Sequence, residues 1–397
     1  MSLQRKPRLP NPALGPLVAA FALCSAGQAL ADPNPYYIGS SVTVRHDSNV
    51  FRLPDSTSDT SYGLALIGGI NQPIGRQRLY ASGTVQDTRF QDLKRLDHTN
   101  YSGKAGIDWE TIYDLSGSLS HTSSQSLYNY GGNSTVISNT KNLERRNESV
   151  ARIRYGKGSL LSLETSYTLR KQSYSDPAFQ FNALDQDAVS VGLTYQPRAS
   201  LTLGTALRYT QGKYQLERDF TRRDVDLTAN WVPSGLSAIN GRISIGKRKA
   251  RSGESAFDFT GSTGQLRWTY QPTGKLAFVT LLSRDSGAES GFINGQEAGA
   301  FGDDSRRTTV LSLNTAYTAT SKIRLDLNLY ANRRSLAQGA FDGRDSVRRA
   351  SLVATYAPVR NVSLSCNVSR DSRNASGQVS FDYDNNSVSC SAQVTLQ

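Results

Sequence analysis

Apolar side chains occupy every second position along most of this chain, and this period limits the possible folds more than any other feature. In 161–170 the odd positions hold Leu, Leu, Thr, Tyr and Leu, and the even positions hold polar residues. The stretch 323–330 repeats the pattern, with Ile or Leu at each odd position. A period of two gives a β-strand one apolar face and one polar face. The sequence therefore predicts an all-β protein.

Strand length distinguishes a membrane barrel from the soluble alternatives, a β-sandwich and a large β-propeller. The predicted strands run about 9 to 12 residues, which suits a tilted membrane strand, whereas strands of soluble sheets usually have about 5 or 6. Hydrophobic residues make up only 37% of the chain. No stretch after residue 31 approaches the roughly 20 apolar residues of a membrane helix. These features favour a barrel that crosses the membrane with strands.

The segments between the predicted strands alternate between short and long. The short turns are 72–75, 111–114, 156–159, 196–199, 232–235, 271–274, 319–322 and 357–360. The long polar segments lie near 47–60, 90–97, 127–145, 174–186, 212–220, 250–256, 286–305, 333–346 and 371–386. Short periplasmic turns and longer outer loops are typical of bacterial outer-membrane barrels.

These turns separate about 18 strands, an even number that returns both termini to the periplasmic side. The predicted strands are 36–46, 61–71, 77–89, 98–110, 115–126, 146–155, 160–173, 187–195, 200–211, 221–231, 238–249, 257–270, 275–285, 306–318, 323–332, 347–356, 361–370 and 387–396. No segment remains for a second domain. We therefore expect residues 32–397 to form one transmembrane antiparallel up-and-down β-barrel in the outer membrane of a Gram-negative bacterium.

Residues 1–31 predict a cleavable signal peptide. The basic stretch 4–8 precedes an apolar run, 13–23, that is too short for a spanning helix, and Ala29-Leu30-Ala31 fits cleavage before Asp32. Cys24 follows the bulky Leu23, whereas lipidation signals need a small residue there. We therefore expect Cys24 to be removed with the signal peptide.

Aromatic residues precede most of the short turns, each in phase with the apolar face of its strand. They are Trp109, Tyr155, Tyr195, Trp231, Tyr270, Tyr317 and Tyr356. Amphipathic rings at one depth predict an aromatic girdle at the membrane interface. Aromatics that close the end of a soluble barrel are the less favoured alternative.

The polar faces of the strands supply candidate pore-lining residues. They are Arg45, Lys104, Asp108, Glu110, Arg152, Arg154, Glu164, Arg208, Asp224, Asp226, Arg242, Arg267, Arg324 and Asp326. Barrels of about 16 to 18 strands are wide enough for an aqueous channel. A lining of mixed sign suits a hydrated, hydrogen-bonding solute such as a glycan. It is equally consistent with charges that only pair with each other along a solvated wall.

The net charge of +12 includes three basic residues of the predicted signal peptide, so the mature chain carries +9. Dibasic pairs recur near the predicted outer rim at 145–146, 170–171, 222–223, 306–307, 333–334 and 348–349. Such cations predict contacts with outer-membrane lipid and the phosphates of lipopolysaccharide, and attraction of an anionic polymer is the second possibility. No nucleic-acid partner is expected, because nothing resembles a recognition module.

Cys366 and Cys390 share the apolar phase of two neighbouring strands, and an oxidising periplasm allows them to pair. We predict a structural cross-strand disulfide.

No enzyme activity, cofactor or metal site is expected, because His46, His98 and His121 are scattered and no nucleophile elbow or spaced ligand cluster is present.

The start of the mature chain carries a more specific motif. Tyr36-Tyr37-Ile38-Gly39-Ser40 is followed by Arg45-His46-Asp47-Ser48-Asn49-Val50-Phe51-Arg52. This segment resembles the start of EpsL-like proteins, β-barrel porins associated with exopolysaccharide biosynthesis loci, in which Asp-Ser-Asn-hydrophobic-Phe-Arg follows the first strand. The resemblance covers the mature chain in architecture and this segment in specific residues. It implies a pore for a secreted polysaccharide that works beside a periplasmic polysaccharide export protein.

Three functional hypotheses follow. The first is a passive channel that exports an exopolysaccharide through its lumen without covalent chemistry. The second is a structural or binding barrel with a closed lumen, whose long loops anchor the polysaccharide at the cell surface. The third, closely related to the first, is a general porin for small solutes.

Overall fold

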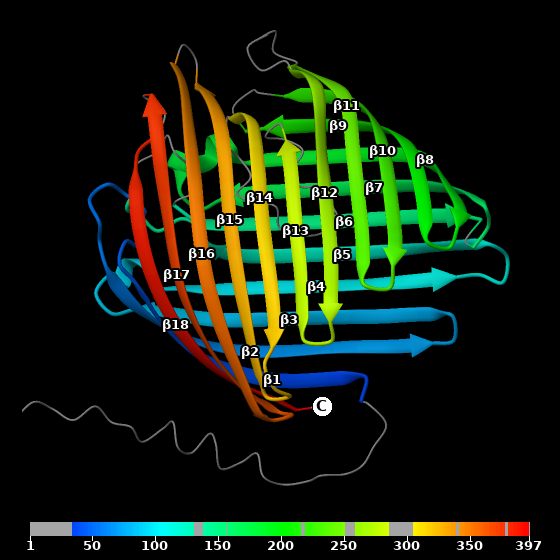
Figure 1. Cartoon of the computed structure of the whole chain (residues 1–397). Helices are drawn as coiled ribbons and strands as arrows, with labels where there is room; N and C mark the ends of the chain where they lie inside the picture. Colours follow the sequence, from blue (N-terminus) through cyan, green and yellow to red (C-terminus); the bar gives the residue numbers. More distant parts are fainter. Residues whose placement is uncertain are drawn as a thin grey trace, which may run out of the picture. The chain divides into compact units, whose positions relative to one another are not determined.

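Eighteen antiparallel strands form one closed sheet, in which every strand pairs with its neighbours in sequence (Figure 1). The ring closes where β1 pairs with β18, from Ile38 opposite Leu396 to Asp47 opposite Ser387. The structure is a computed structural model that describes residues 34–130, 138–156, 158–215, 219–250, 259–285, 305–338, 341–377 and 380–396. The predicted fold class, a transmembrane-type barrel of about 18 strands, is confirmed.

The strands have the following bounds: β1 (Tyr36–Asp47), β2 (Asp59–Ile74), β3 (Gln77–Phe90), β4 (His98–Glu110), β5 (Leu115–Leu127), β6 (Leu143–Tyr155), β7 (Leu161–Tyr174), β8 (Leu184–Arg198), β9 (Leu201–Tyr214), β10 (Phe220–Ser234), β11 (Ser237–Ala250), β12 (Phe259–Thr273), β13 (Leu276–Asp285), β14 (Ser305–Thr318), β15 (Ile323–Gln338), β16 (Phe341–Val359), β17 (Val362–Gly377) and β18 (Tyr383–Leu396). Two short 3-10 helices, η1 (Lys94–Leu96) and η2 (Pro177–Asn182), lie in long connections. In the part of the chain that the structure describes, no helix has the length and apolar character needed to cross a membrane. The predicted signal peptide, residues 1–31, lies outside the described residues.

Each predicted short turn overlaps a hairpin connection, and in five of the eight the strands continue into the predicted turn and the connection ends one residue beyond it. Two of the turns need glycine. Gly75 between β2 and β3 has φ +60°, and Gly156 after β6 has φ +86°. Glycine adopts this left-handed conformation without the steric penalty that a Cβ brings.

The strands extend further toward the long-loop end than the sequence predicts. The segment 333–346, expected to be a loop, is mostly strand, because β15 continues to Gln338 and β16 begins at Phe341. The predicted loop 371–386 is likewise shortened by β17 and β18. Beyond the membrane both faces of a strand contact water, so the apolar alternation ends while the backbone ladder continues. A prediction based on alternation therefore stops too early.

The outer surface of the ring is apolar. Every strand carries at least one large apolar side chain that is exposed, with Leu66 at 66% and Leu207 at 67% among the most exposed. Soluble monomers rarely expose a contiguous apolar surface of this size, whereas the lipid-facing band of an outer-membrane barrel requires one.

The predicted girdle aromatics lie on this outer surface, next to the short turns. Five of them, Tyr155, Tyr195, Trp231, Tyr317 and Tyr356, are strongly exposed. The other two pack sideways on the wall. The ring of Trp109 lies against Gly117, where any side chain would collide with it, and Tyr270 stacks between Trp268 and Phe278.

The structure joins Cys366 and Cys390 in a disulfide bond. The two residues are directly opposite each other on β17 and β18, with 4.1 Å between their Cα atoms. Both share the outward phase of their strands, and β18 is the strand that closes the ring on β1.

Candidate functional site

The inner wall of the barrel carries the polar phase of every strand. On β10, for example, Val225 and Leu227 are exposed on the outside, so Asp224 and Asp226 lie on the inside. The same alternation assigns all the predicted pore-lining residues to the inner wall. Their environments on that wall differ, and only some of them line a cavity.

Many of these inner charges pair with a neighbour along the wall. Arg45 contacts Asp47 at 2.6 Å, Arg324 contacts Asp326 at 2.7 Å, and the guanidinium of Arg154 binds Glu164. Further along, Asp108 lies 3.7 Å from Arg78, and Lys104 lies over the ring of Tyr80. These residues therefore fit the second interpretation of the mixed-sign lining, in which the charges only pair with each other along a solvated wall. Glu110 is the last residue of β4, at the short-turn end of the barrel, and its backbone N–H donates to Gln77 Oε1 at 3.3 Å.

Three of the predicted pore-lining residues are too buried to line a channel, which corrects the sequence prediction. Arg208 is 6% exposed, Asp224 4% and Asp226 7%. Arg208 Nε lies 2.9 Å from Asp226, and the fully buried Arg222 lies 2.8 Å from Asp224. Asp224 fits at this position because it faces Gly246, where an added Cβ would overlap its carboxylate. We call Arg208, Arg222, Asp224 and Asp226 the buried charge cluster.

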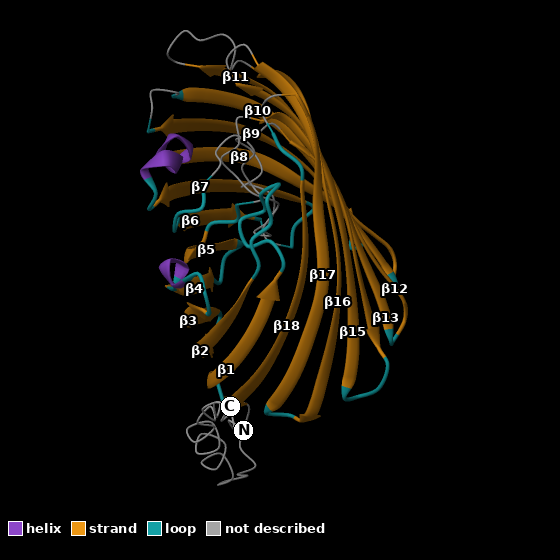
Figure 2. Cartoon of the chain, turned by 90° about the vertical axis from the view of Figure 1, so that its left-hand side faces the viewer, coloured by secondary structure: helices purple, strands orange, loops and turns teal. Residues whose placement is uncertain are grey.

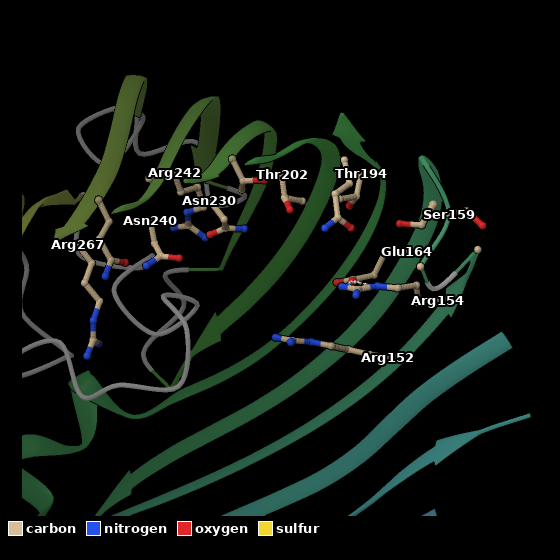
Figure 3. A pocket seen from close by; sticks show the side chains of 17 residues that line it. Arg152, Arg154, Ser159, Glu164, Thr194, Thr202, Asn230, Asn240, Arg242 and Arg267 are labelled. Atoms are coloured by element: carbon tan, nitrogen blue, oxygen red, sulfur yellow. Dashed lines mark hydrogen bonds and ion pairs between the residues drawn. The ribbon is translucent and has the colours of Figure 1, made fainter. Parts of the chain in front are cut away.

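A cavity of about 490 Å³ lies in the inner wall beside β6 to β12, near the short-turn end (Figure 3). The predicted residues that line it are Arg152, Arg154, Glu164, Arg242 and Arg267. Figure 3 shows Arg152 reaching from its strand into open space and Arg267 and Arg242 projecting from the opposite side. The cavity therefore brings together charges from strands that are far apart in sequence.

The charge of this cavity is strongly positive. Its lining holds four arginines and one carboxylate, Glu164, which is already bound to Arg154. The Nε atom of Arg242 is buried and has no hydrogen-bond partner among the described residues. A guanidinium presents several donors in a planar fork that suits carboxylate or phosphate oxygens. The cavity therefore suits the binding of an anion.

Sequence reasoning missed the uncharged part of this lining. Asn230, Asn240, Gln196, Gln265 and the nearby threonines complete the cavity. Amide and hydroxyl groups can donate to a solute or accept from it. Their inward phase was available from the alternation, but a search for charged residues passed over them.

A second feature of the site is an apolar cluster built from the first four long loops. Its members are Val50, Phe51, Leu96, Tyr128, Tyr130, Tyr174, Phe179 and Ala183. They come from the connections after β1, β3, β5 and β7 and from the end of β7. The rings of Phe51 and Tyr130 meet edge to face at 5.3 Å. We call this cluster the loop cap; Figure 2 shows loops at this end lying across the area that the strands enclose.

The Asp47–Arg52 motif folds inward and joins the loop cap to the wall. Arg52 pairs with Asp47 at 3.2 Å and with Asp371 of the inner wall at 3.5 Å. Arg52 has a left-handed φ of 51°, and its Nη1 donates to the carbonyl groups of Asn49 and Val50. Asn49 is 1% exposed and donates to the carbonyl group of Asp384 on β18. The long loop after β1 therefore narrows the long-loop opening of the barrel beside β1 and β18, the two strands that close the ring.

Burial in the loop cap also changes the acidity of one phenol. Tyr130 is 6% exposed, and burial raises its pKa from the ordinary value of 10.0 to about 12. A nearby backbone hydrogen bond acts in the opposite direction and is outweighed. The phenol therefore stays neutral at physiological pH and donates to the carbonyl group of Thr140.

Solved structures that resemble this chain include outer-membrane proteins. OpdK from Pseudomonas aeruginosa aligns with a TM-score of 0.52 and 12% sequence identity, over 91% of this chain and 99% of OpdK. OpdO from the same organism aligns with a TM-score of 0.50 and 12% identity, over 91% of this chain and 98% of OpdO. The fold is that of an outer-membrane barrel. Together with the apolar outer face, this confirms the predicted location in the cell outer membrane.

At 12% identity the likeness to these outer-membrane barrels is one of fold. No protein-family model matches the sequence, and no curated protein matches it. None of these comparisons supports the predicted link to EpsL-like proteins. A function for this barrel is therefore inferred from its own inner wall.

Proposed function

We propose that this outer-membrane barrel is a passive porin for small hydrated solutes, with a preference for anions. The observation that carries the proposal is the excess of arginine over carboxylate in the inner cavity. Arg152 and Arg267 line that cavity without a carboxylate partner among the described residues, unlike Arg154. Fixed positive charge in a polar, partly desolvated wall attracts anions and raises their local concentration.

The fold comparison supports the small size of the solute. One of the similar structures is OpdK with vanillate, a small aromatic carboxylate, at a TM-score of 0.50 and 12% identity. A barrel of 18 strands is also wide enough to enclose an aqueous channel. The amides and hydroxyls beside the arginines would bind the uncharged parts of a polar solute.

Influx of three hexose derivatives into vesicles that contain the purified barrel tests this proposal. Gluconate, glucose and glucosamine are similar in size and differ in charge, so a positive wall predicts influx in that order. The variant Arg152→Ser/Arg267→Ser is expected to reduce the influx of gluconate and leave that of glucose nearly unchanged. The matched control, Arg154→Gln/Glu164→Gln, removes an existing ion pair and is expected to keep the order.

Two results would contradict the proposal. If glucosamine entered faster than gluconate, the wall would not select anions. If none of the three sugars entered through a folded barrel, the lumen would be closed to small solutes.

Export of an exopolysaccharide stays a prediction based on the resemblance of the Asp47–Arg52 segment. One feature of the wall favours a polyhydroxylated guest, a row of inward serines on β17 and β18, where Ser365 bonds Ser391 and Ser369 bonds Ser387. Deletion of the gene, followed by measurement of polysaccharide in periplasm and medium, tests this function. Accumulation in the periplasm with loss from the medium would support export, and no change in either pool would contradict it.

The anchoring hypothesis also stays a prediction. It needs long loops that hold polysaccharide at the surface, but three of those loops bury aromatic side chains in the loop cap and a fourth buries Leu96 there. The same deletion distinguishes this hypothesis, because loss of an anchor sheds polymer from the cell without lowering its total secretion.

A further inference from the structure

We propose that four arginines on the outer face of β14, β15 and β16 bind the phosphoryl groups of lipopolysaccharide in the outer leaflet. The residues are Arg307, Arg333, Arg344 and Arg348, and we call them the arginine patch. The proposal does not depend on the solute of the channel, because the patch faces away from the lumen.

The strand register brings the arginine patch together. Arg307 and Arg344 both lie opposite Ser335, from the two sides of β15. Arg333 lies opposite Ser346, and Arg348 lies opposite Ala331. All four side chains are exposed and in phase with the outward apolar residues of their strands.

The arginine patch has no counter-charge of its own among the described side chains. The outward residues that surround it on these strands are Thr309, Ser335 and Ser346. One carboxylate residue, Asp342 of β16, shares the outward phase of the four arginines, so the cations outnumber the carboxylates on the outward positions of these strands. Like charges side by side on a sheet repel each other. An anion from outside the chain would remove this repulsion.

Three other outward cations of the barrel each have a carboxylate beside them. Arg89 lies 2.7 Å from Asp87, Lys171 lies 3.4 Å from Asp185, and Arg370 lies 3.5 Å from Asp384. These three outward cations therefore have a carboxylate partner, whereas the four arginines of the patch have none among the described side chains.

The height of the patch matches the headgroups of the outer leaflet. Leu325 lies opposite the girdle residue Tyr317 and therefore marks the depth of the girdle on β15. Arg333 is eight residues further along the same strand, a distance of about 26 Å. At the usual tilt of about 40° this is about 20 Å along the membrane normal, near the edge of an apolar band about 25 Å tall. Below the patch the wall presents Leu311 and Leu329 to the acyl chains. A guanidinium can bind a phosphate through two parallel hydrogen bonds.

Binding of fluorescent bisphosphorylated lipid A to the purified full-length barrel in detergent tests the proposal. The variant Arg333→Ser/Arg348→Ser is expected to raise the dissociation constant by about tenfold or more. The control Arg89→Ser/Lys171→Ser also removes two outward cations, but each has a carboxylate partner, so we expect a change of less than about twofold. Heat-modifiable migration on gels verifies that each variant is a folded barrel.

Two further measurements separate lipid from free phosphate. Removal of both phosphates from lipid A should abolish the difference between the wild type and the patch variant, and millimolar inorganic phosphate should not displace bisphosphorylated lipid A. Equal weakening in the patch and control variants would overturn the proposal. Displacement by inorganic phosphate would show a site for the free ion and would overturn it as well.

Discussion

Arg222 and Arg223 are adjacent in sequence and have opposite environments. Arg222 is 1% exposed and binds Asp224, whereas Arg223 is exposed on the outer face. The same division separates Arg333 from Arg334, which is buried against Asp345. Neighbouring residues of a strand point to opposite faces, so a dibasic pair places one cation inside and one outside. In these two pairs only the outward cation is therefore placed to contact outer-membrane lipid, and that contact stays a prediction.

The buried charge cluster predicts an unequal effect of removing inner carboxylates. Asp224→Ala leaves two buried guanidinium groups, Arg208 and Arg222, with reduced pairing, so we expect a loss of about 3–5 kcal/mol in the free energy of unfolding. The matched variant Asp326→Ala breaks the exposed pair with Arg324 and should lose less than about 1 kcal/mol. Urea unfolding in lipid vesicles measures both. Equal losses would show that the cluster contributes no more than a solvated pair.

At the scale of elements, the strands could be predicted and the loop cap could not. Each strand repeats one apolar and one polar phase, so its position and its inward residues follow from the sequence. The loop cap depends on Phe51, Tyr130 and Phe179 meeting across loops far apart in the chain. Aromatic residues inside otherwise polar loops were the available signal, but nothing local specifies their partners.

Phe51 is the residue whose removal should open the loop cap. It is 2% exposed, and Phe51→Ala creates a cavity of the kind that costs about 3–5 kcal/mol. Because the strands do not depend on this contact, we expect the barrel to stay folded while proteolysis of the long loops speeds up at least about tenfold. The control Tyr113→Ala changes a ring that is 82% exposed at a short turn. Loops cleaved at the same rate in both variants would contradict a packed cap.

At the scale of the whole molecule, the sequence predicts which residues face the lumen better than it predicts which of them act there. Alternation assigns Arg152, Arg208 and Arg267 alike to the inner wall. The closed ring then buries Arg208 in a cluster and leaves Arg152 and Arg267 on a cavity. That distinction depends on partners from other strands, because an inner charge is available to a solute only where no neighbour neutralises it.

A passive channel with an anion-attracting wall should give a characteristic zero-current potential when the purified barrel separates two potassium chloride concentrations in a planar bilayer. We expect ohmic conductance, with a potential whose sign shows chloride passing more readily than potassium. The preference should fall in Arg152→Ser/Arg267→Ser. A potential that favours potassium would show that the wall does not attract anions, and no conductance from inserted barrels would show that the lumen is closed.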